Sequence, residues 1–174
     1  AAEAGIVYSL AYGDQPALIC ELVDWCRAAG FEVIAAGKGT KYLPQFHQST
    51  PDTVWDNYGL STAHAQANGL NPQMFNSFID GTKSGIEMAA VANACDLMPG
   101  PDGLGFPPAD LSELPHLLKP TADGGTLARR GTVEVVSSVR RNGQAIEQNL
   151  RWGVYVTFEA PGDYQVKCFG EYGL

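Results

Sequence analysis

The chain has 174 residues, 45% of them hydrophobic and 17% charged, a composition typical of one compact domain or of one domain joined to part of another. The net charge of −8 argues against nucleic acid as a partner, and no run approaches the ~18 apolar residues of a membrane span. The four cysteines, Cys20, Cys26, Cys95 and Cys168, lack metal-ligand spacing, so we expect reduced thiols in a cytoplasmic protein.

The first 36 residues predict a strand–helix–strand unit. Residues 5–11 (GIVYSLA) have the apolar pattern of a buried strand. Asp14 or Gln15 is placed to cap a helix with Pro16 at its first position, and the helical pattern stops at Gly30. Residues 31–36 (FEVIAA) predict a second strand. Such a unit implies parallel pairing and is normally part of a larger α/β sheet.

The rest of the chain supplies no further units of this kind, and residues 1–5 have the pattern of a helix end. We therefore expect a fragment whose N-terminal partner has been removed. The alternative is a small mixed domain in which the two strands join strands that come later in the chain.

Two lysines follow the second predicted strand directly. Lys38 and Lys41 lie in the segment AAGKGTK, where Gly37 and Gly39 allow a tight turn. Because ligands of open α/β sheets bind at the carboxyl ends of strands, these lysines suit a phosphate, a carboxylate or a developing oxyanion, and Thr40 adds a hydroxyl donor. The alternative is an ordinary basic turn. The turn at residues 12–16 (YGDQP) lies at the same edge of the sheet, with a simple helix cap as its alternative.

Residues 41–69 predict mostly irregular structure, and one long helix is then expected from the Asn71 cap and Pro72 to about Ala94. One side of this helix, opposite to the polar stripe described next, carries the apolar residues Phe75, Phe78, Ile79, Ile86 and Ala89. Gly81 and Gly85 lie on one side of the helix, which favours the close approach of another backbone. Four polar residues share an arc of roughly 60° at i, i+4, i+7 and i+11. They are Asn76, Asp80, Lys83 and Glu87.

This polar stripe is a candidate catalytic surface. Lys83 is placed to donate a proton to a carbonyl that is being reduced, while Asp80 and Glu87 set its pKa and orientation. Asn76 and Ser77 are candidates for hydrogen bonds to a substrate head group. The alternative is a solvated face held by i, i+3 and i, i+4 ion pairs.

The C-terminal part begins with a long loop, residues 96–131, which contains one short helix near residues 110–118. From Thr132 the pattern changes to period two. Residues 132–139, 144–150 and 151–160, with a turn around Asn142-Gly143, predict an antiparallel meander, and residues 163–172 predict a closing helix. His47, His64 and His116 are scattered singly and are expected on the surface or in loops. The absence of GxSxG and GxGxxG gives no support to a hydrolase or to a dinucleotide phosphate loop.

Five long motifs carry a resemblance to a known family: YSLAYGDQPALI, FEVIAAGKGTKYLP, STPDTVW, NPQMFNSFIDGTKSGIEMAAVAN and LRWGVYVTFEAP. Together they resemble the homoserine-dehydrogenase-like NAD(P)-dependent oxidoreductases that end in a SAF domain. This family includes the DXR-like reductoisomerase branch of isoprenoid biosynthesis. The resemblance implies an α/β (α+β) chain. Residues 1–45 would be the end of a nucleotide-binding Rossmann-like domain with its parallel sheet, and residues 46–174 a helix-plus-meander catalytic and oligomerisation domain.

The resemblance also implies roles for individual residues. Lys38 and Lys41 become substrate-binding or catalytic lysines, and Asp80 with Lys83 is the distant counterpart of the catalytic Asp–Lys pair of homoserine dehydrogenases, at a spacing of three rather than four residues. NADP or NAD would be held mainly by the missing N-terminal domain, with contacts from Gly13, Asp14, Gln15 and Pro16. The metal-binding carboxylate cluster of reductoisomerases is not evident, so no metal site is expected.

The resulting prediction is an oxidoreductase domain that exchanges a hydride with a small polar, anionic carbonyl or hydroxyl compound, phosphorylated or carboxylated. The expected assembly is a homo-oligomer, a dimer or a tetramer. The alternative function is a non-catalytic oligomerisation or interaction module in which the polar stripe is only a solvated or interdomain face.

Overall fold

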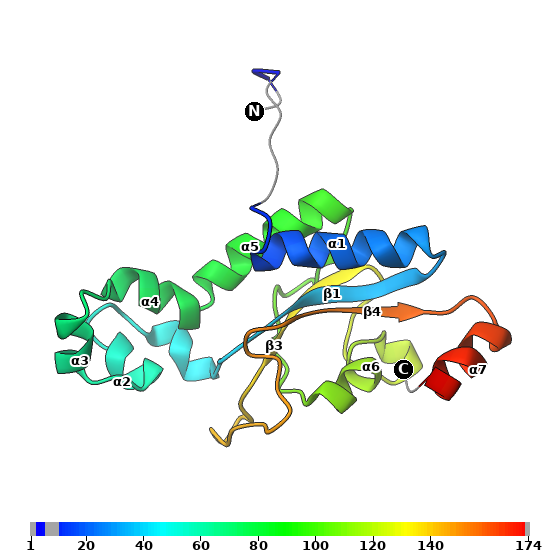
Figure 1. Ribbon diagram of the computed structural model, residues 1–174. Coiled ribbons are helices and arrows are strands. Elements are labelled where there is room, and N and C mark those ends of the chain that lie inside the picture. Colours follow the sequence, from blue (N-terminus) through cyan, green and yellow to red (C-terminus); the bar gives the residue numbers. More distant parts are fainter. Residues whose placement is uncertain (1–2, 6–10, 173–174) are drawn as a thin grey trace.

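Four strands form one mixed sheet, and helices cover its faces (Figure 1). The computed structural model describes residues 3–5 and 11–172, so the strand predicted at residues 5–11 lies outside the described residues except at its two ends. In sheet order the strands are β2 (Met98–Pro99), β3 (Thr132–Ser137), β1 (Glu32–Thr40) and β4 (Val154–Glu159). The expected α/β class is confirmed.

β1 lies at the centre of this sheet. It pairs in parallel with β3 and antiparallel with β4, so that Gly37 lies opposite Glu134 on one side and Tyr155 on the other. The predicted antiparallel meander is therefore wrong, because β1 lies between β3 and β4, and residues 144–150 form no strand. Residues 33–39 of β1 are all buried, and a strand buried in this way needs hydrogen-bonding partners on both edges.

The sheet takes strands from both sides of residue 45. β1 precedes this position in the chain, whereas β2, β3 and β4 follow it. For β1, this is the arrangement predicted by the alternative of a small mixed domain, in which the early strands join strands that come later in the chain. The assignment of residues 1–45 to a nucleotide-binding domain stays a prediction.

β1 continues through the segment that was expected to turn. A Cβ atom on Gly37 would lie 1.8 Å from the Glu134 carbonyl oxygen, and one on Gly39 would lie 1.9 Å from the Leu150 carbonyl oxygen. Both glycines are needed because neighbouring backbone comes too close for a side chain, and not because the chain turns. Lys38, between them, is consequently a strand residue.

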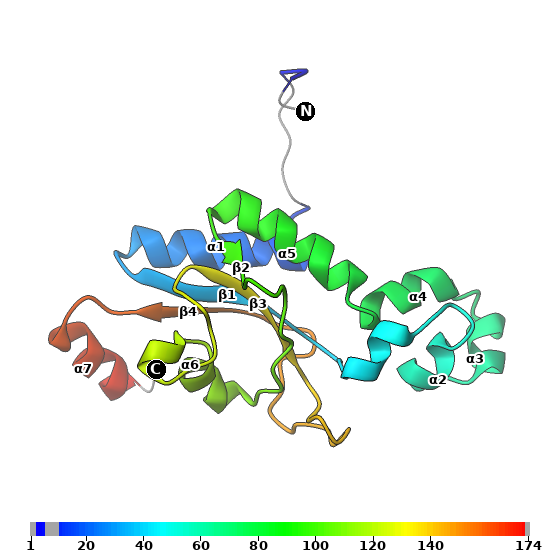
Figure 2. The ribbon, with the colours of Figure 1, turned by 180° about the vertical axis from the view of Figure 1, so that it is seen from behind.

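Two helices, α1 (Gln15–Ala28) and α5 (Thr82–Cys95), pack together on one face of the sheet (Figures 1 and 2). α1 begins and ends as its sequence predicts: the Gln15 N–H donates to Asp14 Oδ1 (3.0 Å), and Gly30 has φ +82° beyond its last turn. The apolar faces of both helices meet β1 and β3 in one core cluster, whose members include Ile19, Val23, Met88, Val91, Ala36 and Val135.

The long central helix is in fact two helices, α4 (Pro72–Ile79) and α5, separated at Asp80 and Gly81. Asn71 caps α4 as predicted, since its Oδ1 accepts hydrogen bonds from two N–H groups of the first turn (2.9 and 3.1 Å). Gly81 has φ +96°, a conformation that suits glycine and that interrupts helical hydrogen bonding. The nearest atom to a Cβ on Gly81 would be a His47 side-chain carbon, and Gly85 has open space around it, so neither glycine serves the close backbone approach that was expected.

The helix break also changes which residues are buried. Glu87, predicted on the polar side, is 7% exposed, whereas Ile86, predicted on the apolar side, is 68% exposed. The predicted stripe on one continuous helix is therefore wrong, because α4 and α5 do not share one helical phase.

The remaining helices lie around the sheet. α2 (Val54–Tyr58), α3 (Thr62–Ala67) and α4 form a lobe beyond the C-terminal end of β1, which a short 3-10 helix, Pro44–Gln48, joins to the sheet. α6 (Leu114–Leu117) packs on the face opposite α1 and α5, between 3-10 turns at Leu111–Glu113 and Thr121–Asp123. α7 (Asp163–Tyr172) is the predicted closing helix. Among the described residues, no helix has both the length and the apolar character needed to cross a membrane.

Candidate active site

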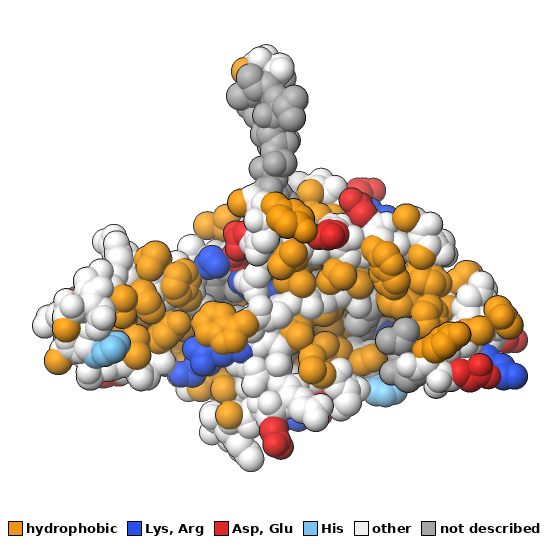
Figure 3. Space-filling view, viewed as in Figure 1, with side chains coloured by type: hydrophobic (Ala, Val, Ile, Leu, Met, Phe, Trp, Pro, Cys, Tyr) orange, Lys and Arg blue, Asp and Glu red, His pale blue; other side chains and the backbone are white. Residues whose placement is uncertain are grey.

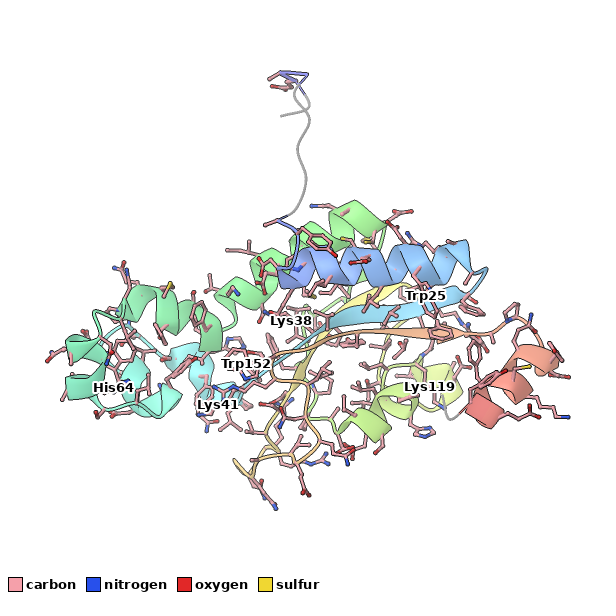
Figure 4. All side chains as sticks on the ribbon, viewed as in Figure 1. Trp25, Lys38, Lys41, His64, Lys119 and Trp152 are labelled. Carbon is pink, nitrogen blue, oxygen red and sulfur yellow. The ribbon has the colours of Figure 1, made fainter. Side chains whose placement is uncertain are left out.

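A cavity of about 190 Å³ opens where the C-terminal end of β1 meets α4, the first turns of α1 and α5, and the turn before β4. Its lining combines four basic side chains with four aromatic ones. They are Lys38, Lys41, Lys83 and Arg151, and Tyr58, Phe75, Phe78 and Trp152. Figure 4 shows Lys38, Lys41 and Trp152 close together at this end of the sheet, while His64 lies at the far side of the helical lobe.

Lys38 lies deepest in this group and is 4% exposed. Its ammonium group forms an ion pair with Glu87 Oε2 and donates a hydrogen bond to Gln15 Oε1 (2.9 Å). Burial lowers the pKa of Lys38, because desolvation penalises the charged form, and the hydrogen bond and negative charge of Glu87 oppose that effect. The strand thus presents a partly destabilised ammonium group that two helices hold in position.

Glu87 links Lys38 to Lys83. The Lys83 ammonium lies 2.9 Å from Glu87 Oε1 as an i, i+4 ion pair, although the geometry falls short of a hydrogen bond. Among the described residues, Glu87 Oε1 has no hydrogen-bond partner. The Lys83 side chain is 40% exposed and lies over the Phe78 ring, 5.3 Å from its centroid. One buried carboxylate therefore connects an internal ammonium group with one that reaches solvent.

Lys41 and Arg151 stand at the other side of the cavity. Lys41 donates to the carbonyl oxygens of Asn57 (3.1 Å) and Tyr58 (3.5 Å) at the end of α2. Burial lowers the pKa of Lys41, and the positive charge of Arg151 lowers it further. The Arg151 guanidinium lies over the Trp152 ring at 5.0 Å and near the Tyr58 ring at 5.9 Å. Trp152 is 77% exposed.

The charge balance of this site is unusual for an acidic chain. Among the described residues, four cationic side chains line the cavity, whereas one carboxylate, Glu87, contacts any of them and a second, Asp14, acts on Lys38 through its charge. Positive charge is therefore in excess here, in a protein whose net charge is −8. Figure 3 shows blue lysine and arginine side chains gathered around an orange group in this part of the surface. An anion that entered the cavity would meet unneutralised cations next to aromatic walls of low polarity.

Three of the predicted site residues, Asn76, Ser77 and Asp80, do not line the cavity. The Asn76 amide donates to the Ser49 carbonyl (3.2 Å) and to Asp80 Oδ2 (2.9 Å), and the Ser77 hydroxyl donates to the Met74 carbonyl (2.6 Å). Asp80 Oδ1 accepts from the Thr82 N–H (2.8 Å), so this carboxylate holds the junction of α4 and α5. These positions give no support to the substrate contacts predicted for Asn76 and Ser77, or to the influence on Lys83 predicted for Asp80. Thr40 does line the cavity, and its hydroxyl reaches the Phe78 carbonyl at 3.5 Å.

The predicted cofactor segment, Gly13 to Pro16, divides between two roles. Gln15 reaches the lysine site through Lys38, whereas Asp14 caps α1 and Pro16 is buried in its first turn. The N-terminus of a helix binds phosphate through free N–H groups, but here the Asp14 carboxylate takes that position and would repel a second anion. These residues do not fit the pyrophosphate of a dinucleotide.

Sequence reasoning missed Arg151 and Trp152. Both follow Leu150 on the turn before β4, and residues 151–160 as a whole were predicted to be strand. The sequence feature that could have pointed to these two residues is a basic–aromatic pair directly before Gly153, which is typical of exposed turns. Nothing local indicated that this turn would reach Lys41, because the pairing of β4 with β1 brings them together.

Other candidates are less suited to polar chemistry. In the described part of the chain, no group of three or more His, Cys, Asp or Glu side chains is placed to hold a metal ion. A larger cavity of about 750 Å³ lies between β4, α6 and α7, and its lining is mostly apolar. Arg130 at its rim forms ion pairs with Glu32 (3.0 Å), Asp123 (3.6 Å) and Glu159, so this charge is already neutralised.

Comparison with known proteins assigns the chain to a protein family. The family model described as "Oxidoreductase DRL, catalytic domain" matches residues 13–174, which is nearly the whole chain. No curated protein matches the sequence. The matched range includes β1, the two helices that contact Lys38, and the turn that carries Arg151.

Proposed function

The chain belongs to the family of oxidoreductase DRL catalytic domains, and from this premise we propose that its lysine-lined cavity binds a small anionic carbonyl or hydroxyl compound for reduction or oxidation. The surplus of positive charge around the cavity is the observation that carries this proposal. A phosphate or carboxylate group would be attracted to it, and the volume of about 190 Å³ suits a compound of a few carbon atoms.

Lys38 is the proposed proton donor. A carbonyl oxygen that is being reduced gains negative charge and needs a proton, which an ammonium group of lowered pKa releases more readily than an ordinary lysine. Gln15 and Glu87 fix the direction of its N–H bonds. In the oxidation direction the neutral amine accepts the proton from the hydroxyl group.

Glu87 and Lys83 would restore the proton to Lys38. Glu87 contacts both ammonium groups, and Lys83 is the one that reaches solvent. A proton taken up by Lys83 would reach Lys38 through the carboxylate once the Lys83 ammonium turns to hydrogen-bond Glu87 Oε1, from which it now lies 2.9 Å away. The sequence predicts that Lys83 donates a proton to the substrate. In the revised role, Lys83 donates a proton to Lys38 through Glu87.

Lys41 and Arg151 would hold the anionic end of the substrate. Both line the cavity opposite the Lys38–Glu87 pair, and the planar guanidinium of Arg151 suits bidentate contact with a carboxylate or phosphate. Phe75, Phe78 and Trp152 would exclude water, which strengthens each charge interaction inside the cavity.

A nicotinamide dinucleotide, NAD or NADP, would supply or accept the hydride in this reaction. We propose that a separate nucleotide-binding domain holds it, because Gly13 to Pro16 do not fit a pyrophosphate. The residues of this chain then bind the substrate, orient it and move the proton.

A second candidate function is self-association. β4 is at the edge of the sheet, and α7, which follows it, exposes Tyr164, Val166 and Tyr172. In this case the sheet edge would join copies of the chain into a dimer or tetramer. Size measurement of the Lys41→Ala variant separates the two functions, because loss of anion binding with unchanged size supports the lysine cavity.

The direct test is anion binding by the full-length protein. Isothermal titration with inorganic phosphate and with pyruvate should give an affinity that falls at least tenfold in Lys41→Ala and falls with added salt. Lys119→Ala is the matched control, because Lys119 lines the larger cavity. Turnover of small phosphorylated and carboxylated carbonyl compounds with NADPH or NADH should fall in parallel. Equal anion affinities in the two variants would exclude the proposed site.

A further inference from the structure

Two cysteines meet where α1 and α5 pack together. Cys20 Sγ and Cys95 Sγ lie 3.4 Å apart, and the Cys95 thiol donates a hydrogen bond to the Cys20 sulfur. Cys95 is buried, whereas Cys20 is partly exposed. The two residues are 75 positions apart in sequence and lie on different helices, so only the packing of α1 on α5 brings their sulfur atoms into contact.

We propose that Cys20 and Cys95 are a reversible modification site, which a peroxide converts to a disulfide that links α1 to α5. The Cys20 sulfur attacks one peroxide oxygen, the O–O bond breaks, and Cys20 becomes a sulfenic acid with release of one water. The Cys95 sulfur then attacks the Cys20 sulfur, the S–O bond breaks, and a second water leaves with the Cys95 proton. Two thiols are oxidised by two electrons, and one hydrogen peroxide is reduced to two waters.

The surroundings of each sulfur set the order of these steps. Peroxide reaches Cys20 from solvent, while Cys95 is 4% exposed and lies among core residues. Burial raises the pKa of Cys95 to about 12, and its contact with Cys20 adds to this, so Cys95 stays a thiol until Cys20 has been oxidised. Cys20 is therefore the sulfur that attacks the peroxide, and Cys95 resolves the sulfenic acid.

The link would act on the lysine site. α1 carries Gln15 and α5 carries Glu87, and these two side chains hold the Lys38 ammonium from either helix. Cys20 lies about 7.5 Å along α1 from Gln15, and Cys95 lies about 12 Å along α5 from Glu87. A disulfide bond of about 2.05 Å requires the sulfurs to approach by about 1.35 Å, and rotation of the two side chains together with a small movement of α1 against α5 would supply it.

Movement of either helix would displace Gln15 or Glu87 from the Lys38 ammonium and should lower kcat/KM about threefold to tenfold, because even displacements below 1 Å impair positioned catalytic groups. This consequence rests on the proposed function, whereas the disulfide itself does not. The cross-link should also raise the Tm by roughly 5–10 °C, because it closes a long loop in the unfolded chain.

The test treats the full-length protein with hydrogen peroxide and then blocks free thiols by alkylation. Mass spectrometry of unreduced peptides should find Cys20 joined to Cys95, and dithiothreitol should reverse the link and its effect on kcat/KM. Cys20→Ser and Cys95→Ser should abolish both, while Cys168→Ser, which removes a partly exposed cysteine on α7, should change neither.

The outcomes separate the two parts of the proposal. Oxidation of Cys20 to sulfinic or sulfonic acid without a cross-link would overturn the modification site. A cross-link that forms while kcat/KM is unchanged would overturn its control of the lysine site. If the protein shows no turnover in either state, the proposed function fails, and the cross-link is still judged by mass and Tm.

Discussion

The two cavities at opposite ends of β4 differ in volume and, more usefully, in how their charges are paired. The larger one, about 750 Å³, has a mostly apolar lining, and its Arg130 meets three carboxylates. The smaller one, about 190 Å³, has four cationic side chains against Glu87. Volume alone would select the larger cavity, where the charge of Arg130 is already paired. The more informative quantity is the positive charge that has no counter-ion and lies next to apolar side chains, because an anionic ligand can neutralise such a charge.

Replacing Lys38 should produce the largest effect. Lys38→Met removes the proposed proton donor, so kcat should fall about 10³-fold, and it leaves Glu87 with one partner fewer, which should cost about 3 kcal/mol of stability. Steady-state kinetics and urea unfolding of the full-length protein measure the two effects. The double variant Lys38→Met/Glu87→Gln should regain most of the stability and none of the activity. A Lys38→Met enzyme with normal kcat would remove Lys38 from the mechanism.

Arginine replacements compare the two cavities directly. Arg151→Ala should raise KM by about 10- to 150-fold with little change in kcat, because a hydrogen bond to a charged ligand group is worth about 1.5–3 kcal/mol. Arg130→Ala is the matched control and should leave KM within about twofold, because Arg130 lines the other cavity and three carboxylates already pair with its charge. Equal KM values for the two variants would mean that the charge surplus has no role in binding.

The pH dependence of kcat should identify the proton donor. Glu87 raises the Lys38 pKa against the effect of burial, so Glu87→Gln should lower that pKa further. Reduction needs the protonated amine, and the alkaline fall of kcat should therefore move to lower pH, by about one unit. Glu159→Gln removes a carboxylate that pairs with Arg130 at the other cavity and should leave the profile unmoved. An unmoved profile in Glu87→Gln would contradict the assignment of Lys38.

The smallest expected effects concern the helix junction behind the lysine cavity. Gly81→Ala should lower the free energy of unfolding by about 1–2 kcal/mol, because Gly81 has φ +96° and a Cβ would lie 3.2 Å from a His47 ring carbon. Gly85→Ala should raise it by about 0.5–1 kcal/mol, because Gly85 is helical and its Cβ position is open. Thermal or urea unfolding measures both changes. Changes of the same sign would show that the conformation of Gly81 is not what interrupts the helix.

Local signals in the sequence were sufficient for helix ends and for the position of two lysines. Asp14, Asn71 and Gly30 act where their caps and stops predicted, because each uses hydrogen bonds or dihedral preferences within a few residues. Lys38 and Lys41 do lie at the C-terminal end of a sheet strand and line a cavity. Their catalytic and binding roles stay predictions.

Packing between segments far apart in sequence determined which side chains are buried and which line the cavity. The burial of Glu87 and the exposure of Ile86 reverse the predicted faces, because Gly81 changes the helical phase and α5 then packs according to what lies beneath it. The order of the strands brings Arg151 and Lys41 to the same cavity, and no pattern within either segment encodes that proximity.

Residue spacing in this chain thus accounts for caps, helix stops and candidate cations, because the forces involved act over one or two turns of backbone. The strand order, the Lys38–Glu87 pair and the Cys20–Cys95 contact depend on which surfaces are buried together. That choice is made by the sum of many weak contacts between segments far apart in sequence, and a single local pattern cannot report such a sum.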